Sequence, residues 1–527
     1  MVSGRSPHPW RFAFAFCAIA VGLGLVPFAP AAATTDAAVT GSGSSEAAAA
    51  VDQWSADVQP RFPVAYSGSG SSQGKDDYAN LASDFAVTDV PYLGIDPETA
   101  AEDTDRGRVY GAAPVLADAV AFPYRLEVDG KLVRNLRLSP LTLADIFTLR
   151  ITNWDSPLIS HDNNGRKLPS LPIVPVVHSE GSGSSYWFTS YLVAEQRAIW
   201  RAFNGASNAS QYWPRQGAEV ALDGSSSIGD YLAQKANNGA IAMDEPNTAL
   251  DNDLPVAAVE NPAGYFTTPP AYDVELSLTK ASVNTNPSSP HYAWPNLKPL
   301  YADKDPRSYP LSYFGDLYVP TSPSDPRMST AKRQSLADFL DRAECQGQRE
   351  AGVLGYGLLP PKLVTIAFAQ MSALKAADPG VDVSKDTIAA CANPTFPKGH
   401  PDVDLIPKAT PYPPDCATAG AGPCAAQRTD ATALELTVSK RSVPQHHRTA
   451  FHGLLMYRPS HTRIIATVRL ERRHHGHWLV LAKRTTSAYG RVVFHLKPTA
   501  TASYRLAYLG PSARPAVSAV IKVSVRH

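Results

Sequence analysis

The pentapeptide Gly-Ser-Gly-Ser-Ser occurs three times in this chain, at residues 41–45, 68–72 and 181–185. Each copy follows an apolar run that is typical of a strand and precedes a stretch that can form a helix. Glycine lets a backbone pass close to a ligand, and the free N–H groups at a helix start favour an anion. Serine hydroxyls add hydrogen-bond donors without charge. The three turns therefore predict a small oxyanion held by converging loops, with flexible Gly/Ser filler as the alternative.

The segments around these turns alternate between strand and helix. Strand-like runs lie at 64–67, 85–88, 173–177 and 239–243, and helix-like runs lie at 46–58, 75–82, 142–149, 186–200, 228–237, 332–344 and 361–374. This order is characteristic of α/β domains with mostly parallel sheets. Ligands in such domains bind where loops leave the carboxyl ends of strands, which is where the Gly-Ser turns fall.

Six motifs occur in a fixed order between about residues 39 and 374: VTGSGSSEAAAAVDQW, VAYSGSGSSQG followed by SDFAVTDVPY, VPVVHSEGSGSSYWFTSYL, NNGAIAMDE, YPLSYFGDLYV and GYGLLPPKLV. This ordered set resembles the PstS family, the phosphate-binding proteins of ABC importers. The resemblance implies a type II periplasmic-binding fold with two α/β lobes and inorganic phosphate in the cleft between them. It also implies a binding protein rather than an enzyme, with no cofactor and no metal.

The resemblance further implies which residues contact phosphate. Carried over by position, they are Ser45, the backbone N–H of Glu46, Ser71, Asp89, His178, Glu180, Ser182, Gly183 and Ser184. Asp89, when ionised, can accept the proton that phosphate still carries at neutral pH, whereas sulfate has no proton to give. A buried mismatch of this kind discriminates by about 10⁴–10⁵.

Three positions depart from the family pattern. His178 stands where the family usually has arginine, and histidine lacks the bidentate fork of a guanidinium. Glu180 replaces an aspartate, and Glu46 replaces an apolar residue.

Two other functions compete with phosphate capture. Residues 70–74 form a G-x-S-x-G motif, the nucleophile elbow of α/β hydrolases, and Asp89 and His178 follow Ser72 in the order that a Ser-Asp-His triad requires. A secreted serine hydrolase using Ser72 is therefore one alternative. The other is a surface interaction protein that has kept the fold but has a degenerate anion site.

Residues 1–33 are typical of a secretory signal peptide, because Arg5 and Arg11 precede an apolar run at 12–26 and small residues follow it. Cys17 lies within that run and would be removed with it. We therefore expect a protein that is secreted or associated with the cell surface.

The mature chain would keep four cysteines, an even number that suits an oxidising compartment. Three pairings are possible, and we favour Cys345–Cys391 and Cys416–Cys424. The second pair would close a short loop inside a Pro- and Ala-rich stretch.

The charge is distributed unevenly along the chain. The whole sequence has 48 basic and 48 acidic residues, but residues 431–527 contain 16 Lys and Arg against Glu435 and Glu471 alone. Apolar and polar residues alternate there in short runs, which resembles the bacterial Ig-like surface modules. The expected domains are a two-lobed domain at 34–378 (lobe I about 34–115 and 260–378, lobe II about 116–259), a disulfide-pinned linker at 379–430 and a basic β-sandwich at 431–527.

The expected partners follow from this organisation. They are inorganic phosphate, an ABC permease, and an anionic cell-wall polymer or membrane surface that the basic C-terminal domain would contact. Nucleic acid is not expected outside a cell, and the chain is expected to be a monomer.

Overall fold

The computed structural model describes residues 36–527 with the exception of 60, 253, 425–430, 459–465, 487–490, 509–515 and 527. The expected signal peptide, with Cys17, lies outside the described residues. Among the residues that are described, no helix combines the length and the apolar character needed to cross a bilayer.

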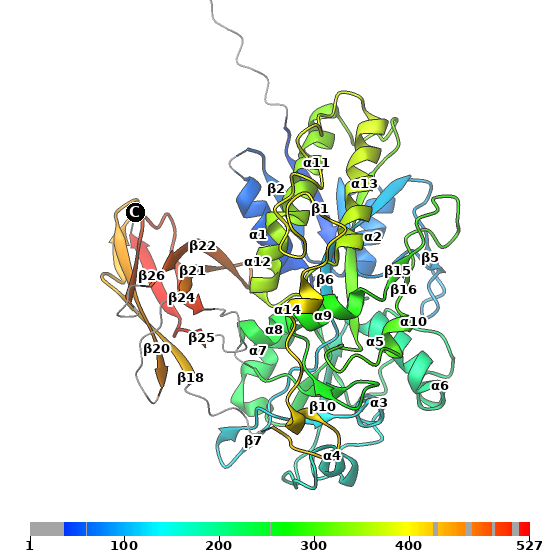
Figure 1. The fold of residues 1–527 in the computed structure, drawn as a ribbon, viewed down its shortest axis with the longest axis vertical. Helices are drawn as coiled ribbons and strands as arrows, with labels where there is room; N and C mark the ends of the chain where they lie inside the picture. Colours follow the sequence, from blue (N-terminus) through cyan, green and yellow to red (C-terminus); the bar gives the residue numbers. More distant parts are fainter. Residues whose placement is uncertain are drawn as a thin grey trace, which may run out of the picture. The chain divides into compact units, whose positions relative to one another are not determined.

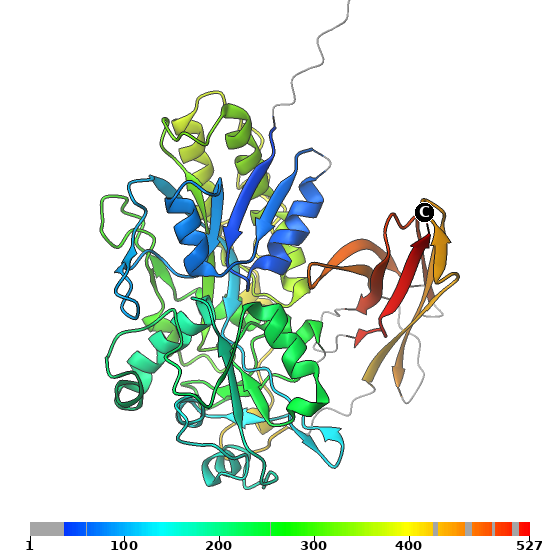
Figure 2. The same cartoon turned by 180° about the vertical axis from the view of Figure 1, so that it is seen from behind.

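The first sheet contains five strands: β2 (Val64–Ser67), β1 (Val39–Gly43), β3 (Phe85–Thr88), β17 (Ser312–Pro320) and β6 (Tyr110–Ala119), in that spatial order. β1 pairs in parallel with both β2 and β3, whereas β17 runs antiparallel to β3 and β6. β3 and β17 are buried along their whole length, which explains their nearly continuous apolar sequences. In Figures 1 and 2 helices α11 (Thr330–Glu344) and α13 (Pro361–Ala377) lie side by side next to this sheet.

A second sheet places β10 (Val174–His178) between β11 (Val220–Leu222) and β12 (Ala240–Ala242), with both pairings parallel. A third, smaller sheet has the order β14 (Phe266–Thr267), β13 (Ala258–Glu260), β9 (Arg137–Leu138). The predicted α/β class is confirmed, and the Gly-Ser loops after β1 and β10 leave the carboxyl ends of parallel strands. Three short hairpins complete the strands of this part: β4 (Gly94–Ile95) with β5 (Glu102–Asp103), β7 (Glu127–Val128) with β8 (Lys131–Leu132), and β15 (Ser282–Val283) with β16 (Pro295–Asn296).

The helices of this part are α1 (Ala48–Val58), α2 (Ser71–Ala79), α3 (Pro140–Phe147), α4 (Pro157–Asp162), α5 (Gly183–Glu195), α6 (Arg197–Asn204), α7 (Gly224–Ala233), α8 (Pro246–Asp251), α9 (Ala271–Leu278), α10 (Lys298–Tyr301), α11 (Thr330–Glu344), α12 (Gln346–Leu354), α13 (Pro361–Ala377) and α14 (Ile406–Ala409). Two expectations were wrong. The single helix expected at 186–200 is two helices, because Gln196 leaves helical geometry at φ −131° and ψ 38°. The helix expected from residue 75 begins at Ser71, which puts Ser71 and Ser72 in its first turn.

The Pro-rich segment 394–424 packs against the rest of the body. The guanidinium of Arg307 donates to the carbonyls of Pro407 and Thr410, and that of Arg137 donates to the carbonyls of Ala417 and Thr418. The structure contains the disulfides Cys345–Cys391 and Cys416–Cys424, the pairs that the sequence favoured. Composition indicated a linker here, but these contacts attach the segment along much of its length.

The C-terminal part is all β, as expected, and has a hydrophobic core of its own. One sheet has the order β18 (Ala431–Val438), β20 (Thr449–Arg458), β23 (Arg491–Leu496); the other contains β19 (Ser442–Pro444), β26 (Ile521–Arg526), β24 (Ala502–Tyr508), β21 (Thr467–His474), β22 (His477–Thr485) and β25 (Ala516–Val517). The sequence patterns did not single out β20, which pairs with both β18 and β23. Among the described residues of this part, the basic side chains of Arg469 and Arg505 are buried, and both form ion pairs with Glu471.

Candidate functional site

The three Gly-Ser turns converge at the carboxyl ends of parallel strands. The first ends β1, the second opens α2 and the third opens α5. Glycine is required at two of the contacts, since a Cβ on Gly183 would lie 2.4 Å from Cβ of Asp89. A Cβ on Gly70, whose φ is +98°, would lie 2.8 Å from Cγ of Glu180. The predicted convergence of the loops is therefore present.

Glu46 extends its side chain into this convergence. Its carboxylate accepts hydrogen bonds from the backbone N–H of Ser184 at 2.9 and 3.1 Å, and from the Tyr313 hydroxyl at 2.9 Å. The sequence suggested only a backbone contact from Glu46, because the direction of its side chain cannot be read from the motif. A carboxyl group of the protein therefore uses a donor at the start of α5, where an anion was expected.

Asp89 follows β3 and is almost completely buried. The Ser71 hydroxyl donates to its Oδ2 at 3.0 Å and accepts from its backbone N–H at 3.2 Å. Burial raises the pKa of Asp89, and hydrogen bonds from Ser44 and Ser71 oppose that rise. Ser71 and Asp89 are thus adjacent, as their assignment to one site requires.

His178 ends β10 and its side chain is fully buried. Its Nδ1 lies 2.7 Å from Oε1 of Glu180, and its Nε2 lies 3.4 Å from Oε1 of Glu46 and 3.4 Å from Oδ1 of Asp244. Burial lowers the pKa of His178, but the carboxylates of Glu180 and Asp244 outweigh burial and raise it well above its usual value. The imidazole is therefore the basic centre of a group of carboxyl side chains.

The remaining assigned residues lie around this centre. The Ser45 hydroxyl lies 3.4 Å from Oε1 of Glu180, which also accepts the N–H of Gly224 at 3.0 Å. Ser182 is the N-cap of α5, since its hydroxyl accepts the N–H of Ser185. Ser182 thus fixes the start of the helix that presents Gly183 and the N–H of Ser184.

Four further residues of the cluster were not assigned from the sequence: Asp118, Ser225, Asp244 and Glu245. The Ser225 hydroxyl lies within hydrogen-bonding distance of two acidic side chains, at 2.9 Å from Oδ1 of Asp244 and 2.7 Å from Oε2 of Glu245. Asp244 and Glu245 follow β12 after Met243, within the motif NNGAIAMDE, so two acidic residues after a strand were the available signal. Only the pairing of β12 with β10 brings them to His178.

Burial controls the protonation of these carboxyl groups. It raises the pKa of Glu46 to about 7 and the pKa values of Asp118 and Glu245 well above their usual range. Burial also acts on Asp244 and Glu180, but contact with His178 outweighs it and lowers both pKa values. A carboxyl that keeps its proton can donate a hydrogen bond to an anion, and an ionised one can accept the proton of phosphate. The same oxygens, with an imidazole nitrogen, could alternatively bind a cation.

The Ser-Asp-His order proposed for a hydrolase does not correspond to a triad in this structure. The Ser72 hydroxyl donates to Oε1 of Gln211 at 2.7 Å, while Nδ1 of His178 contacts Glu180. A nucleophilic serine needs its base within hydrogen-bonding reach.

Residues 29–341 match the family described as the PBP superfamily domain. The chain belongs to this superfamily. It is 28% identical over 333 residues to the phosphate-binding protein PstS of Methanocaldococcus jannaschii, covering 62% of this chain and 83% of that protein. It is 27% identical over 337 residues to PstS of Xylella fastidiosa strain Temecula1, covering 63% of this chain and 84% of that protein. Among solved structures, a high affinity periplasmic phosphate-binding protein, PfluDING, is 20% identical with a TM-score of 0.48. The match covers 65% of this chain and 98% of that protein.

Proposed function

We propose that the chain captures inorganic phosphate at the site where its three Gly-Ser turns meet, as the substrate-binding protein of an ABC importer or of a phosphate sensor. The observation that carries this proposal is that residues of all three turns lie against Asp89 or Glu180, and that Glu180 in turn contacts the buried His178. The PstS relatives support it, because they match this chain across more than three fifths of its length.

The assigned contact set is Ser45, Glu46, Ser71, Asp89, His178, Glu180, Ser182, Gly183 and Ser184. Hydroxyl and backbone N–H groups would donate hydrogen bonds to the phosphate oxygens. Each hydrogen bond to a charged acceptor contributes roughly 1.5–3 kcal/mol to binding. Asp89 would accept the proton of phosphate, and Glu46 would have to move or share a proton, since it uses the N–H of Ser184. Selectivity against sulfate follows from Asp89.

The surroundings of this site belong to the same proposal. The two disulfides suit a protein that works outside the cytoplasm, and so does the expected removal of residues 1–33 as a signal peptide. A permease would receive the phosphate, and the basic residues of 431–527 would hold the chain at an anionic surface. The domain boundaries expected from the sequence are part of the proposal as well. A hydrolase using Ser72 is not favoured, because the Ser72 hydroxyl donates a hydrogen bond to Gln211.

Isothermal titration of residues 34–527 with phosphate, sulfate and arsenate tests the proposal. We expect one phosphate per chain and strong rejection of sulfate at pH 7. In Asp89→Asn, loss of one charge-assisted hydrogen bond should weaken phosphate binding by about 10- to 150-fold, which corresponds to 1.5–3 kcal/mol. Sulfate should bind better to the variant, because the amide can donate to it.

Asp129→Asn is the matched control, since Asp129 is exposed on the turn between β7 and β8. It should leave both anions unaffected. Equal binding of phosphate and sulfate by the unaltered protein would refute the role of Asp89, and absence of phosphate binding would refute the proposed function.

A further inference from the structure

Three buried side chains from different strand ends bring potential metal-binding atoms together. Glu46 follows β1, His178 ends β10 and Asp244 follows β12, and one ligand atom from each lies within 4.8 Å of the others. All three residues are at most 1% exposed. An imidazole nitrogen with two carboxylate oxygens is a ligand set that suits a first-row divalent metal ion.

The distances within this triad fit metal ligands better than a hydrogen bond. Within the described part of the chain, Nε2 of His178 and Oδ2 of Asp244 are buried without a hydrogen-bond partner. Nε2 lies 3.4 Å from oxygens of both Glu46 and Asp244, beyond the range of about 2.7–3.2 Å for a good N–H···O bond. In a tetrahedral centre with metal–ligand bonds of about 2.1 Å, neighbouring ligand atoms are about 3.4 Å apart.

Neighbouring groups already orient the three side chains. Glu180 holds Nδ1 of His178 at 2.7 Å, which directs Nε2 toward Glu46 and Asp244. A carboxylate on the far nitrogen is the usual partner of a metal-binding histidine. The Tyr313 hydroxyl fixes Oε2 of Glu46 and the Ser225 hydroxyl fixes Oδ1 of Asp244. The site is therefore built before any ion binds.

The charge of the site also calls for a cation. His178 is the basic group that the structure pairs with Glu46, Glu180 and Asp244, so three carboxyl side chains surround one imidazole. A phosphate would add further negative charge.

We propose that Glu46, His178 and Asp244 bind one divalent transition-metal ion, with zinc as the best match, and that its open fourth position accepts a phosphate oxygen. The second half of this statement rests on the proposed phosphate function. Three protein ligands leave one position free in a tetrahedral zinc centre, as in zinc sites that bind substrate.

The test uses residues 34–527 stripped with a chelator and then dialysed against micromolar zinc. Elemental analysis should find one zinc per chain, and cobalt in place of zinc should give the intense visible bands of a tetrahedral centre. Glu46→Gln and Asp244→Asn keep the side-chain shapes. Loss of a residue that only hydrogen-bonds to a metal ligand weakens metal binding by about 10- to 100-fold, so each of these variants should weaken zinc binding by more than that. Thermal unfolding of the metal-free variants checks that they fold.

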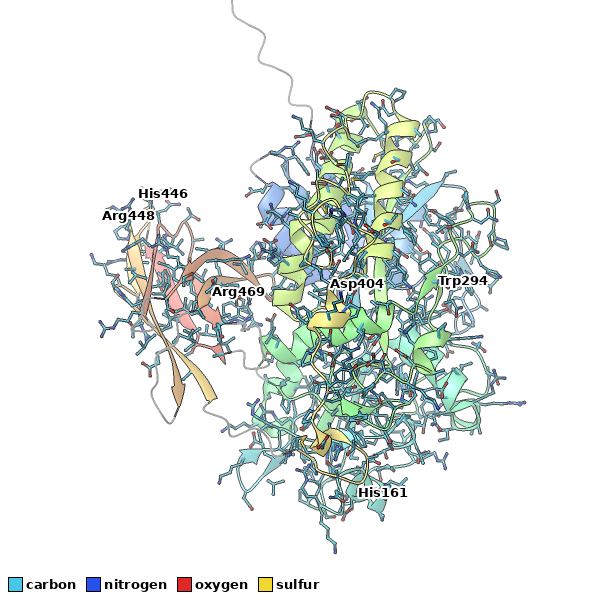
Figure 3. The ribbon with its side chains drawn as sticks, viewed as in Figure 1. His161, Trp294, Asp404, His446, Arg448 and Arg469 are labelled. Atoms are coloured by element: carbon cyan, nitrogen blue, oxygen red, sulfur yellow. A yellow bond between two sulfur atoms is a disulfide. The ribbon has the colours of Figure 1, made fainter. Side chains whose placement is uncertain are left out.

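His161→Gln is the control, because the side chain of His161 on α4 is 88% exposed and lies at the edge of the body in Figure 3. It should bind zinc like the unaltered protein. Failure of the unaltered protein to bind zinc, or zinc binding that survives both Glu46→Gln and Asp244→Asn, overturns the metal site.

Titration with phosphate, with and without zinc, tests the second half. Phosphate should bind at least about tenfold more tightly to the zinc form, a difference of 1.4 kcal/mol. Equal affinities for phosphate in the two forms would overturn the link between metal and anion. Phosphate binding without zinc uptake would overturn the metal site and leave the proposed function standing, whereas no phosphate binding in either form would reject the proposed function.

Discussion

Glu275 offers a direct test of how the Pro-rich segment packs on the body. This glutamate lies on α9, is completely buried and is next to Asp404, a residue of segment 394–424 that Figure 3 labels. Burial, together with the charge of Asp404, raises the pKa of Glu275 to about 10 from an ordinary value of 4.5. At neutral pH the folded protein therefore keeps a proton that the unfolded chain has released.

The size of the effect follows from proton linkage. A raised pKa in the folded state means that the free energy of unfolding falls as pH rises above 4.5, by up to about 1.4 kcal/mol per pH unit. Between pH 5 and 8 the titration of Glu275 alone would lower the free energy of unfolding by up to about 4 kcal/mol. Glutamine has the shape of the protonated acid and cannot ionise. Glu275→Gln should therefore stabilise the protein at pH 8 by about 2–4 kcal/mol and change little at pH 5.

Urea unfolding followed by tryptophan fluorescence at pH 5 and pH 8 measures this difference. Comparing the variant with the unaltered protein at each pH cancels the titration of other groups. Glu195→Gln serves as the control, since Glu195 is exposed at the end of α5 and should show no dependence on pH. A stability difference for Glu275→Gln that is the same at both pH values would refute the buried-proton argument and the packing from which it derives.

Three further predictions concern the site, the disulfides and the C-terminal domain. In chelator-treated protein, His178→Arg should bind phosphate more tightly than the unaltered protein at pH 8, because a guanidinium can donate two parallel hydrogen bonds to the anion; an unchanged dissociation constant would show that position 178 does not face the anion. Reduction should destabilise the body more than the tail, and mass mapping of the unreduced protein should find Cys345 linked to Cys391 and Cys416 to Cys424; free thiols at these positions would contradict the oxidising compartment. The full mature chain should sediment with cell walls at low salt and be released as salt rises, whereas a chain ending at 430 should stay in solution; equal sedimentation of both would reject the tether.

The sequence predicted the strands near the site well. β2 and β3 have the bounds expected from their apolar runs, because a short buried strand flanked by Gly and Ser leaves few alternatives. The break between α5 and α6 was missed, since glutamine at 196 has a good helix propensity and only the backbone shows the interruption.

The candidate site was predictable in part. The Gly-Ser turns could be found because each follows an expected strand, and Asp89 and His178 were assigned from the resemblance to the PstS family. Asp244 was not assigned, because its approach to His178 depends on the pairing of β12 with β10, a long-range contact that no local pattern encodes. The side chain of Glu46 was overlooked for a similar reason, since its partner Tyr313 comes from β17.

The attachment of segment 394–424 has a mechanical consequence. Arg137 on β9 holds the carbonyls of Ala417 and Thr418, which lie inside the loop that Cys416–Cys424 closes. If the C-terminal domain is anchored to a surface, tension along the chain enters the body at this loop and passes into β9 and its neighbour β13. The loops that meet at His178 leave other sheets, so the load would bypass them, and the chain could be held under strain while the site stays free to bind and release.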